Sequence, residues 1–166
     1  METITESDCA TIIAKRVCIS TGRDKLGRPL LTCICGRHDK HNRDILEIKK
    51  FIIHFMEQSV RQSNPDDEMF SIIFDLSAFS LRCMDFESVK LLIDILQQNY
   101  PEVLGQALVV NSPFIFSACW RVIKPWLDPV TAAKVNFVSL PQLTDYIDPE
   151  YILPEVGDSS LVPLEI

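Results

Sequence analysis

The chain has 166 residues, of which 47% are apolar and 23% are charged, which fits one folded domain and excludes a disordered segment. No apolar run approaches the roughly 20 residues that a membrane-spanning helix needs. The N-terminal residues METITESDCA contain acids where a signal peptide has basic and then apolar residues, so we expect a soluble, cytoplasmic protein.

The formal net charge of −7 is distributed unevenly along the chain. Residues 15–50 contain ten of the sixteen Lys and Arg residues but only four of the 23 acids. Such a segment either meets an anionic surface or forms a solvated face, and composition does not decide between the two. The acidic chain as a whole, and the near-absence of aromatic residues in this segment, argue against nucleic acid as a partner.

Segments typical of strands and helices alternate along the chain. Strands are predicted at 16–20 and 30–35, followed by a helix at 44–61 with apolar side chains at helical spacing. In order, there follow a buried strand at 69–76, a helix at 85–99, a strand at 107–111, a helix at 113–124, a strand at 134–138 and a short helix at 142–146. This alternation predicts an α/β fold with a mostly parallel β-sheet flanked by helices. Such sheets usually place ligands at the carboxyl ends of their strands.

The six cysteines are expected to be free, buried thiols, because the chain lacks a secretion signal and is long enough to bury a core. Zinc is an alternative at Cys33, Cys35, His38 and His41, which lie within nine residues of one another. Their spacing is tighter than that of a zinc finger, and both cysteines would face one side of a strand. We therefore predict no metal and no other cofactor.

Enzyme motifs are missing from the sequence, which contains no GxSxG elbow, no P-loop and no GxGxxG. Ser, His and Asp residues are present, but nothing in their spacing places them as a triad. The sequence therefore predicts a protein that is not an enzyme.

Residues 113–129, PFIFSACWRVIKPWLDP, form a segment that is apolar nearly all round a helix. Its large side chains include Phe114, Phe116, Trp120, Ile123 and Trp126. One interpretation is a packed core helix, which periodicity alone favours. The other is a lid over an apolar cavity, with aromatic residues that contact a bilayer when it opens.

Residues 99–135, NYPEVLGQALVVNSPFIFSACWRVIKPWLDPVTAAKV, resemble the signature of CRAL-TRIO lipid-binding domains. Other family motifs occur in the same order: D-x-x-G-R-P at 24–29, a strand ending in Asp within 72–80, and L-P-x-x-G at 153–157. The stretch FDLSAFSLRCMDFESVK is similar to fungal members of the phosphatidylinositol-transfer type. The resemblance implies an N-terminal extension at 1–15, a CRAL-TRIO domain at 16–158 and a C-terminal tail at 159–166.

The resemblance also implies a lipid cavity with the sheet as its floor and a gate helix that starts near Pro113. Glu102 and Lys134 correspond to residues that line the inositol-phosphate site, with Thr131 beside the lysine. A lysine can pair with a phosphate, and a carboxylate can accept hydrogen bonds from inositol hydroxyls. Lys25 and Arg28 are further head-group candidates. The alternative is that Glu102 and Lys134 only pair with each other.

The resemblance thus predicts a protein that binds a membrane lipid and exchanges it between membranes, acting peripherally on intracellular membranes. Phosphatidylinositol is one expected ligand. Where phosphatidylcholine-binding members have Ser and Thr, this chain has Phe70-Ser71-Ile72, which favours a more apolar second ligand such as a sterol-like or isoprenoid lipid. The alternative is an interaction or membrane-docking module that carries no cargo, either a shortened paralogue or a fragment that lacks the N-terminal helical domain and the longer tail of transfer-type members.

Overall fold

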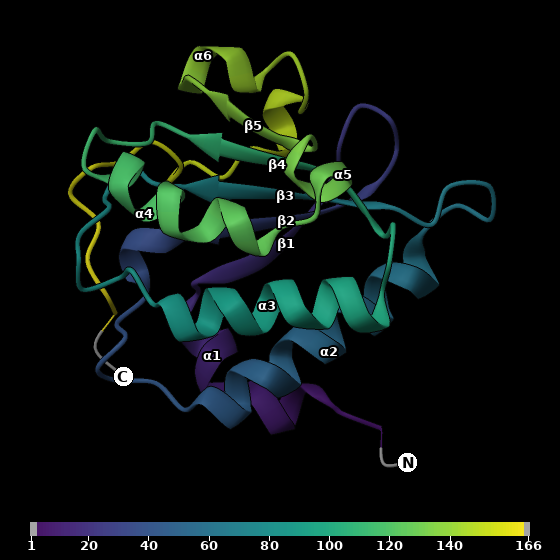
Figure 1. The fold of residues 1–166 in the computed structure, drawn as a ribbon. Helices are drawn as coiled ribbons and strands as arrows, with labels where there is room; N and C mark the ends of the chain where they lie inside the picture. Colours follow the sequence, from purple (N-terminus) through teal and green to yellow (C-terminus); the bar gives the residue numbers. More distant parts are fainter. Residues whose placement is uncertain (1–2, 165–166) are drawn as a thin grey trace.

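The centre of the computed structural model, which describes residues 3–164, is a five-stranded sheet (Figure 1). Its strands lie in sequence order: β1 (Cys18–Arg23), β2 (Pro29–Ile34), β3 (Phe70–Asp75), β4 (Leu104–Val110) and β5 (Val135–Val138). β1 pairs with β2 in antiparallel orientation, whereas the other neighbours are parallel. The predicted α/β fold with a mostly parallel sheet is confirmed.

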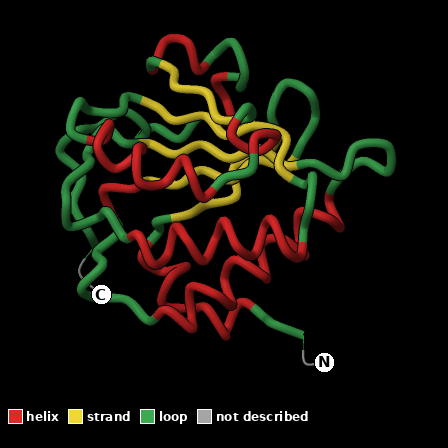
Figure 2. The backbone as a smooth tube through the Cα atoms, in the orientation of Figure 1, coloured by secondary structure: helices red, strands yellow, loops and turns green. Residues whose placement is uncertain are grey.

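Within residues 3–164, six α-helices connect or flank these strands (Figure 2). They are α1 (Ala10–Lys15), α2 (Ile45–Gln62), α3 (Phe86–Asn99), α4 (Phe116–Ile123), α5 (Pro129–Ala132) and α6 (Leu140–Leu143). Both long helices begin at an aspartate: Asp44 accepts a hydrogen bond from the Leu46 amide, and Asp85 accepts one from the Ser88 amide. No helix within residues 3–164 is long and apolar enough to cross a bilayer.

The two faces of the sheet have different covers, because side chains alternate along each strand. On one face, which we call the helical face, Phe70 and Ile72 of β3 pack against α2 and α3. On the other face, Ile73 packs against Leu143 and Val156 of the C-terminal segment. Both faces are therefore buried, which explains why the central strands are apolar along most of their length.

Two buried aspartates on the second face tie distant segments together. Asp75, at the end of β3, accepts a hydrogen bond from the Gly157 amide at 3.0 Å and one from the Ser77 hydroxyl at 2.6 Å. Asp24 accepts hydrogen bonds from the Ser71 hydroxyl at 2.5 Å and the Gln106 amide group at 3.1 Å. The family motifs at 24–29 and 153–157 are thus docked onto the central strands.

The segment predicted as an N-terminal extension contains helical structure that the sequence analysis did not predict. Glu6–Cys9 forms a 3₁₀ turn that leads into α1, and Cys9 is fully buried. The Ile12 amide donates a hydrogen bond to the Glu47 carboxylate on α2 at 2.8 Å. The available signal was Asp8, whose carboxylate accepts from the Thr5 amide at 2.8 Å, a pattern typical of a helix start.

Several other elements differ from the sequence predictions: β1 is Cys18–Arg23 rather than 16–20, and α6 is Leu140–Leu143 rather than 142–146. β4 begins at Leu104 rather than at residue 107, and α4 begins at Phe116 because Pro113–Ile115 forms a turn. The short helix α5 was not predicted, because four residues are too few to show a helical period.

Candidate functional site

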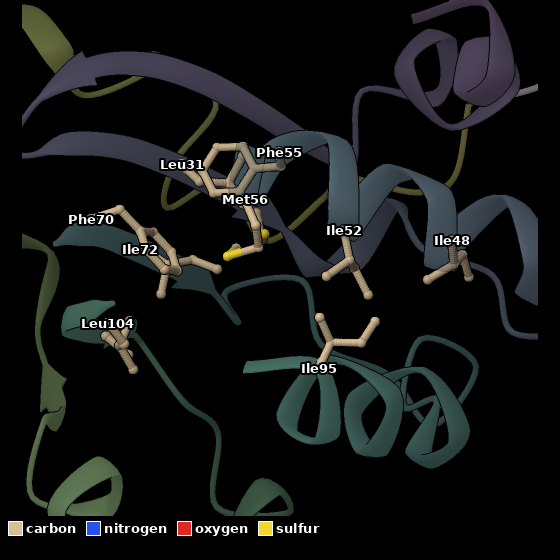
Figure 3. Close-up of a cluster of buried hydrophobic side chains, with 11 residues drawn as sticks. Leu31, Ile48, Ile52, Phe55, Met56, Phe70, Ile72, Ile95 and Leu104 are labelled. Atoms are coloured by element: carbon tan, nitrogen blue, oxygen red, sulfur yellow. The ribbon is translucent and has the colours of Figure 1, made fainter. Parts of the chain in front are cut away.

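An apolar cavity of about 290 Å³ lies between the helical face of the sheet and helices α2, α3 and α4. Figure 3 shows part of its surroundings, with Ile52 of α2 pointing toward Ile95 of α3. Strands and helices both supply lining side chains: Leu31, Cys33, Phe70, Ile72, Phe74, Ala107, Val109 and Val135 from the sheet region, and Ile52, Phe55, Met56, Leu92, Ile93, Leu96, Phe116, Trp120 and Ile123 from the helices. The cavity is therefore suited to hydrocarbon rather than to a charged molecule.

Helix α4 forms one side of this cavity through Phe116, Trp120 and Ile123. The Phe116 ring packs edge-on against Phe79, with ring centroids 5.5 Å apart, and Trp120 packs against Phe137 at 5.3 Å. The inner face of α4 is thus held by aromatic contacts on two sides, each of which adds to the stabilisation from burial.

Phe114 and Trp126 do not line the cavity. They differ in this from Phe116, Trp120 and Ile123, the other candidates of the same segment. Phe114 is 94% exposed in the turn before α4. Trp126 packs edge-on against Phe86, with centroids 6.2 Å apart, and the Lys90 ammonium lies 5.7 Å from its ring centroid. Phe114 is therefore exposed, whereas Trp126 is partly buried against the core beside the cavity.

The head-group candidates Glu102, Thr131 and Lys134 lie near the amino ends of β4 and β5. The Lys134 ammonium donates a hydrogen bond to the Leu104 carbonyl oxygen at 2.6 Å. Glu102 is exposed in the preceding turn, with a φ of 64°. Within residues 3–164, the structure shows no ion pair between Glu102 and Lys134, which is the arrangement considered as the alternative.

Thr131 lines the cavity at this end, and its hydroxyl donates to the Asp128 carboxylate at 3.1 Å. These residues therefore lie at the amino ends of the strands, whereas sheets of this kind usually bind ligands at the carboxyl ends. In this fold the crossover helices cover the helical face of the sheet, so the cavity extends along the strands. Polar side chains can therefore lie at both ends of the cavity.

The other two head-group candidates have structural contacts of their own. The Arg28 guanidinium donates to the Asp67 carboxylate at 3.0 Å and packs against Gly105 at the start of β4. Lys25 has an exposed side chain, and its backbone amide donates to the Tyr146 carbonyl at 3.0 Å. Neither residue lines the cavity, and among the other three head-group candidates only Thr131 does.

A polar cluster that sequence reasoning missed lines another part of the cavity. It consists of Asp85 with His38, Arg43 and Ser88. The Asp85 carboxylate accepts hydrogen bonds from Arg43 Nε and His38 Nε2, both at 2.9 Å, and from the Ser88 hydroxyl at 2.7 Å. Burial alone would raise the pKa of Asp85, but the hydrogen bonds from Arg43, Ser88 and His38 outweigh it and hold that pKa well below its ordinary value.

The four residues considered for zinc are dispersed in the structure. The His38 ring bonds to Asp85, His41 is exposed, and Cys33 lies beside Cys18 with 2.8 Å between their sulfur atoms. In the described part of the chain, no three His, Cys, Asp or Glu side chains gather as a metal-binding group.

Four of the ten basic residues at 15–50 form ion pairs within residues 3–164. Arg16 and Arg37 pair with the Glu155 carboxylate at 3.4 and 3.2 Å. Arg43 pairs with Asp85 and Glu87. These contacts connect the basic segment to α3 and to the C-terminal motif, so the paired arginines serve the fold rather than an external anionic surface.

Comparison with known proteins identifies the family. Residues 14–157 match the model described as the CRAL/TRIO domain. The chain belongs to the CRAL/TRIO domain family. The family is one of lipid-binding domains, in accord with the apolar cavity and with the resemblance seen in the sequence.

Fungal relatives of this CRAL/TRIO domain are considerably longer proteins. It is 33% identical over 141 residues to the CRAL-TRIO domain-containing protein C3H8.02 of Schizosaccharomyces pombe, covering 84% of this chain and 32% of that protein. It is 35% identical over 137 residues to the phosphatidylinositol transfer protein CSR1 of Eremothecium gossypii, covering 82% and 31%. The chain thus spans about a third of the length of these relatives.

Among solved structures, the one titled "Crystal structure of Sfh5" has a similar fold. Its TM-score is 0.65 at 22% sequence identity, with 82% of this chain and 51% of that chain covered. This similarity supports the arrangement of sheet and helices described above.

Proposed function

We propose that this CRAL/TRIO domain binds a membrane lipid in its apolar cavity and exchanges the lipid between membranes through movement of α4. The observation that carries the proposal is the cavity of about 290 Å³ bounded by apolar side chains of the sheet, α2, α3 and α4. Burying hydrocarbon there stabilises a complex by about 0.8 kcal/mol per methylene. The protein carries its cargo unchanged and catalyses no reaction.

The size of the cavity supports a moving gate. Small-molecule pockets have volumes of roughly 300–1,000 Å³, so this cavity is at the lower end and a lipid with two acyl chains would require it to widen. α4 is suited to move because only one side of it faces the cavity. Val122 on α4 is 48% exposed, and Phe114 and Ile115 in the turn before α4 are 94% and 50% exposed. These side chains could enter the interfacial region of a membrane as α4 swings outward.

Two features bear on the identity of the ligand. Lys134 and Glu102 at the amino ends of β4 and β5 can receive the phosphate and hydroxyls of phosphatidylinositol, once Lys134 releases the Leu104 carbonyl. Phe70 and Ile72 line the cavity, whereas the Ser71 hydroxyl points to Asp24 on the other face. The middle of the cavity therefore suits a more apolar lipid, of the sterol-like or isoprenoid class.

The direct test is lipid uptake by the purified chain. Native mass spectrometry would detect a lipid retained from expression, and vesicles with labelled phosphatidylinositol, sterol or isoprenoid would report uptake. We expect one lipid per chain and net transfer to acceptor vesicles. If no lipid is retained and none of the three probes is taken up, the proposal is wrong.

A second candidate function is membrane docking without cargo, which the exposed side chains of Phe114, Ile115 and Val122 favour. Docking alone predicts that the chain associates with vesicles but extracts no lipid. It also predicts that Glu102→Ala combined with Lys134→Ala leaves vesicle association unchanged. Lipid extraction that this double substitution abolishes would exclude docking as the sole function.

A further inference from the structure

Cys18 on β1 and Cys33 on β2 face each other across the antiparallel pair of strands. Their sulfur atoms lie 2.8 Å apart, and both side chains line the cavity. All six cysteines are free thiols. In the part of the chain that the structure describes, no other two cysteine sulfurs are joined by a hydrogen bond, so this pair is distinct.

The register of β1 and β2 suits this pair to a covalent bond. The Ile34 amide donates to the Val17 carbonyl at 2.7 Å, which makes Cys18 and Cys33 a non-hydrogen-bonded pair of the ladder. Cα atoms at such pairs are about 4.5 Å apart, and disulfides span Cα distances of about 4.4–6.8 Å. A bond between the two sulfurs therefore needs little movement of the backbone.

We propose that Cys18 and Cys33 form a reversible disulfide under oxidising conditions, so that the cavity carries a redox-sensitive link between its edge strand and the rest of the sheet. The proposal does not depend on the proposed function, because it follows from the pairing of β1 and β2 alone. Its oxidant is a peroxide, and its reductant is a dithiol.

The two thiols have unequal environments, which sets the order of the chemistry. Cys33 is buried and Cys18 is partly exposed. The hydrogen bond with Cys18, together with burial, raises the pKa of Cys33, so Cys33 retains its proton. Because Cys18 is the more accessible thiol, it reacts first with the oxidant. Cys33 is then the resolving thiol, which attacks the oxidised sulfur of Cys18.

The reaction balances in two steps. The Cys18 sulfur attacks one oxygen of hydrogen peroxide, the O–O bond breaks, and the products are Cys18 sulfenic acid and one water. The Cys33 sulfur then attacks the Cys18 sulfur, and the displaced hydroxyl leaves as a second water with the proton of Cys33. Two thiols are oxidised to one disulfide while one peroxide is reduced.

The position of the link gives it a structural consequence. β1 is an edge strand that pairs only with β2, and it follows directly from the segment that holds α1 against α2. A Cys18–Cys33 bond would close the turn at 24–29 into a covalent loop and fix β1 to the sheet. Closing a loop of this size is expected to raise Tm by about 5 °C or more.

The test treats the folded chain with hydrogen peroxide and then with a dithiol. Intact mass should fall by two hydrogen atoms and peptide mapping should find Cys18 joined to Cys33, with Tm raised until the dithiol reverses both changes. Cys18→Ser and Cys33→Ser should each abolish the mass and Tm changes, and Cys18→Ala repeats the test if a serine impairs folding. Cys83→Ser is the matched control, because Cys83 lines the same cavity but bonds to the Ser80 carbonyl. A link between other cysteines, or Cys18 oxidised without a link to Cys33, overturns the proposal.

Discussion

The Lys134 ammonium donates a hydrogen bond to the carbonyl oxygen of Leu104, 2.6 Å away, at the start of β4. The Leu104 carbonyl follows the turn that contains Glu102, so the lysine reaches the neighbourhood of this carboxylate without pairing with it. The carbonyl is neutral, so this hydrogen bond does not pair the ammonium with a negative charge. An anionic head group can therefore replace the carbonyl with a gain in charge–charge interaction.

Replacing Lys134 by Ala should weaken phosphatidylinositol uptake by about tenfold or more, because a charge-assisted contact with phosphate contributes roughly 1.5–3 kcal/mol. Glu102→Ala should have a smaller effect in the same direction. Uptake from vesicles with labelled phosphatidylinositol measures both. Lys49→Ala is the control, since Lys49 is an exposed lysine on α2 that is not a head-group candidate and does not line the cavity. Equal losses in Lys49→Ala and Lys134→Ala would contradict a specific head-group site.

Local patterns were sufficient to predict the sheet and its two long helices. Ile48, Ile52, Phe55 and Met56 recur at helical spacing, and all four are buried on α2. Four of the six residues of β3 are apolar, on both of its faces, because both faces are covered, as periodicity and length together indicate. α1 was missed because it is held by a contact with α2, more than thirty residues further along the chain.

The site was less predictable than the fold. His38 and Arg43 meet Asp85 across separations of 47 and 42 residues, and no local pattern shows such a meeting. The inward or outward direction of Phe114 and Phe116 could not be decided either, because apolar residues surround that helix on all sides. Only the turn at Pro113–Ile115 exposes Phe114 while Phe116 is buried.

Phe114→Ser should weaken association with vesicles several-fold without lowering Tm, because a side chain that is 94% exposed contributes little to the folded state. Co-sedimentation with phospholipid vesicles measures the association. Leu26→Ser is the matched control: Leu26 is 67% exposed on the turn between β1 and β2, away from α4. If both variants lose association equally, the contact does not involve the start of α4.

Ala107→Leu should reduce lipid uptake, because Ala107 is a small side chain on β4 that lines the cavity. The added carbons occupy space that cargo would fill, and overpacking is expected to change stability by about 1–3 kcal/mol at most. Val110→Leu adds bulk to the other face of the same strand and should leave uptake unchanged. Unimpaired uptake by Ala107→Leu would place the ligand elsewhere.

Asp85→Asn should lower the free energy of unfolding at neutral pH. It should also make that free energy change less as the pH falls. The pKa of Asp85 is held below its ordinary value of 3.8, so the unfolded chain takes up the proton first as the pH falls. The stability that this carboxylate contributes is thus fully present above about pH 5 and is lost progressively below it. We expect the free energy of unfolding to fall by about 2 kcal/mol at pH 7, which lowers Tm by roughly 5 °C. This difference from the parent chain should become smaller toward pH 2.

Asp44→Asn is the control, because Asp44 caps α2 from an exposed position and has no arginine partner within residues 3–164. Thermal unfolding at a series of pH values measures this effect. If the difference in Tm between Asp85→Asn and the parent chain is the same at every pH, the charge of Asp85 does not stabilise the cluster.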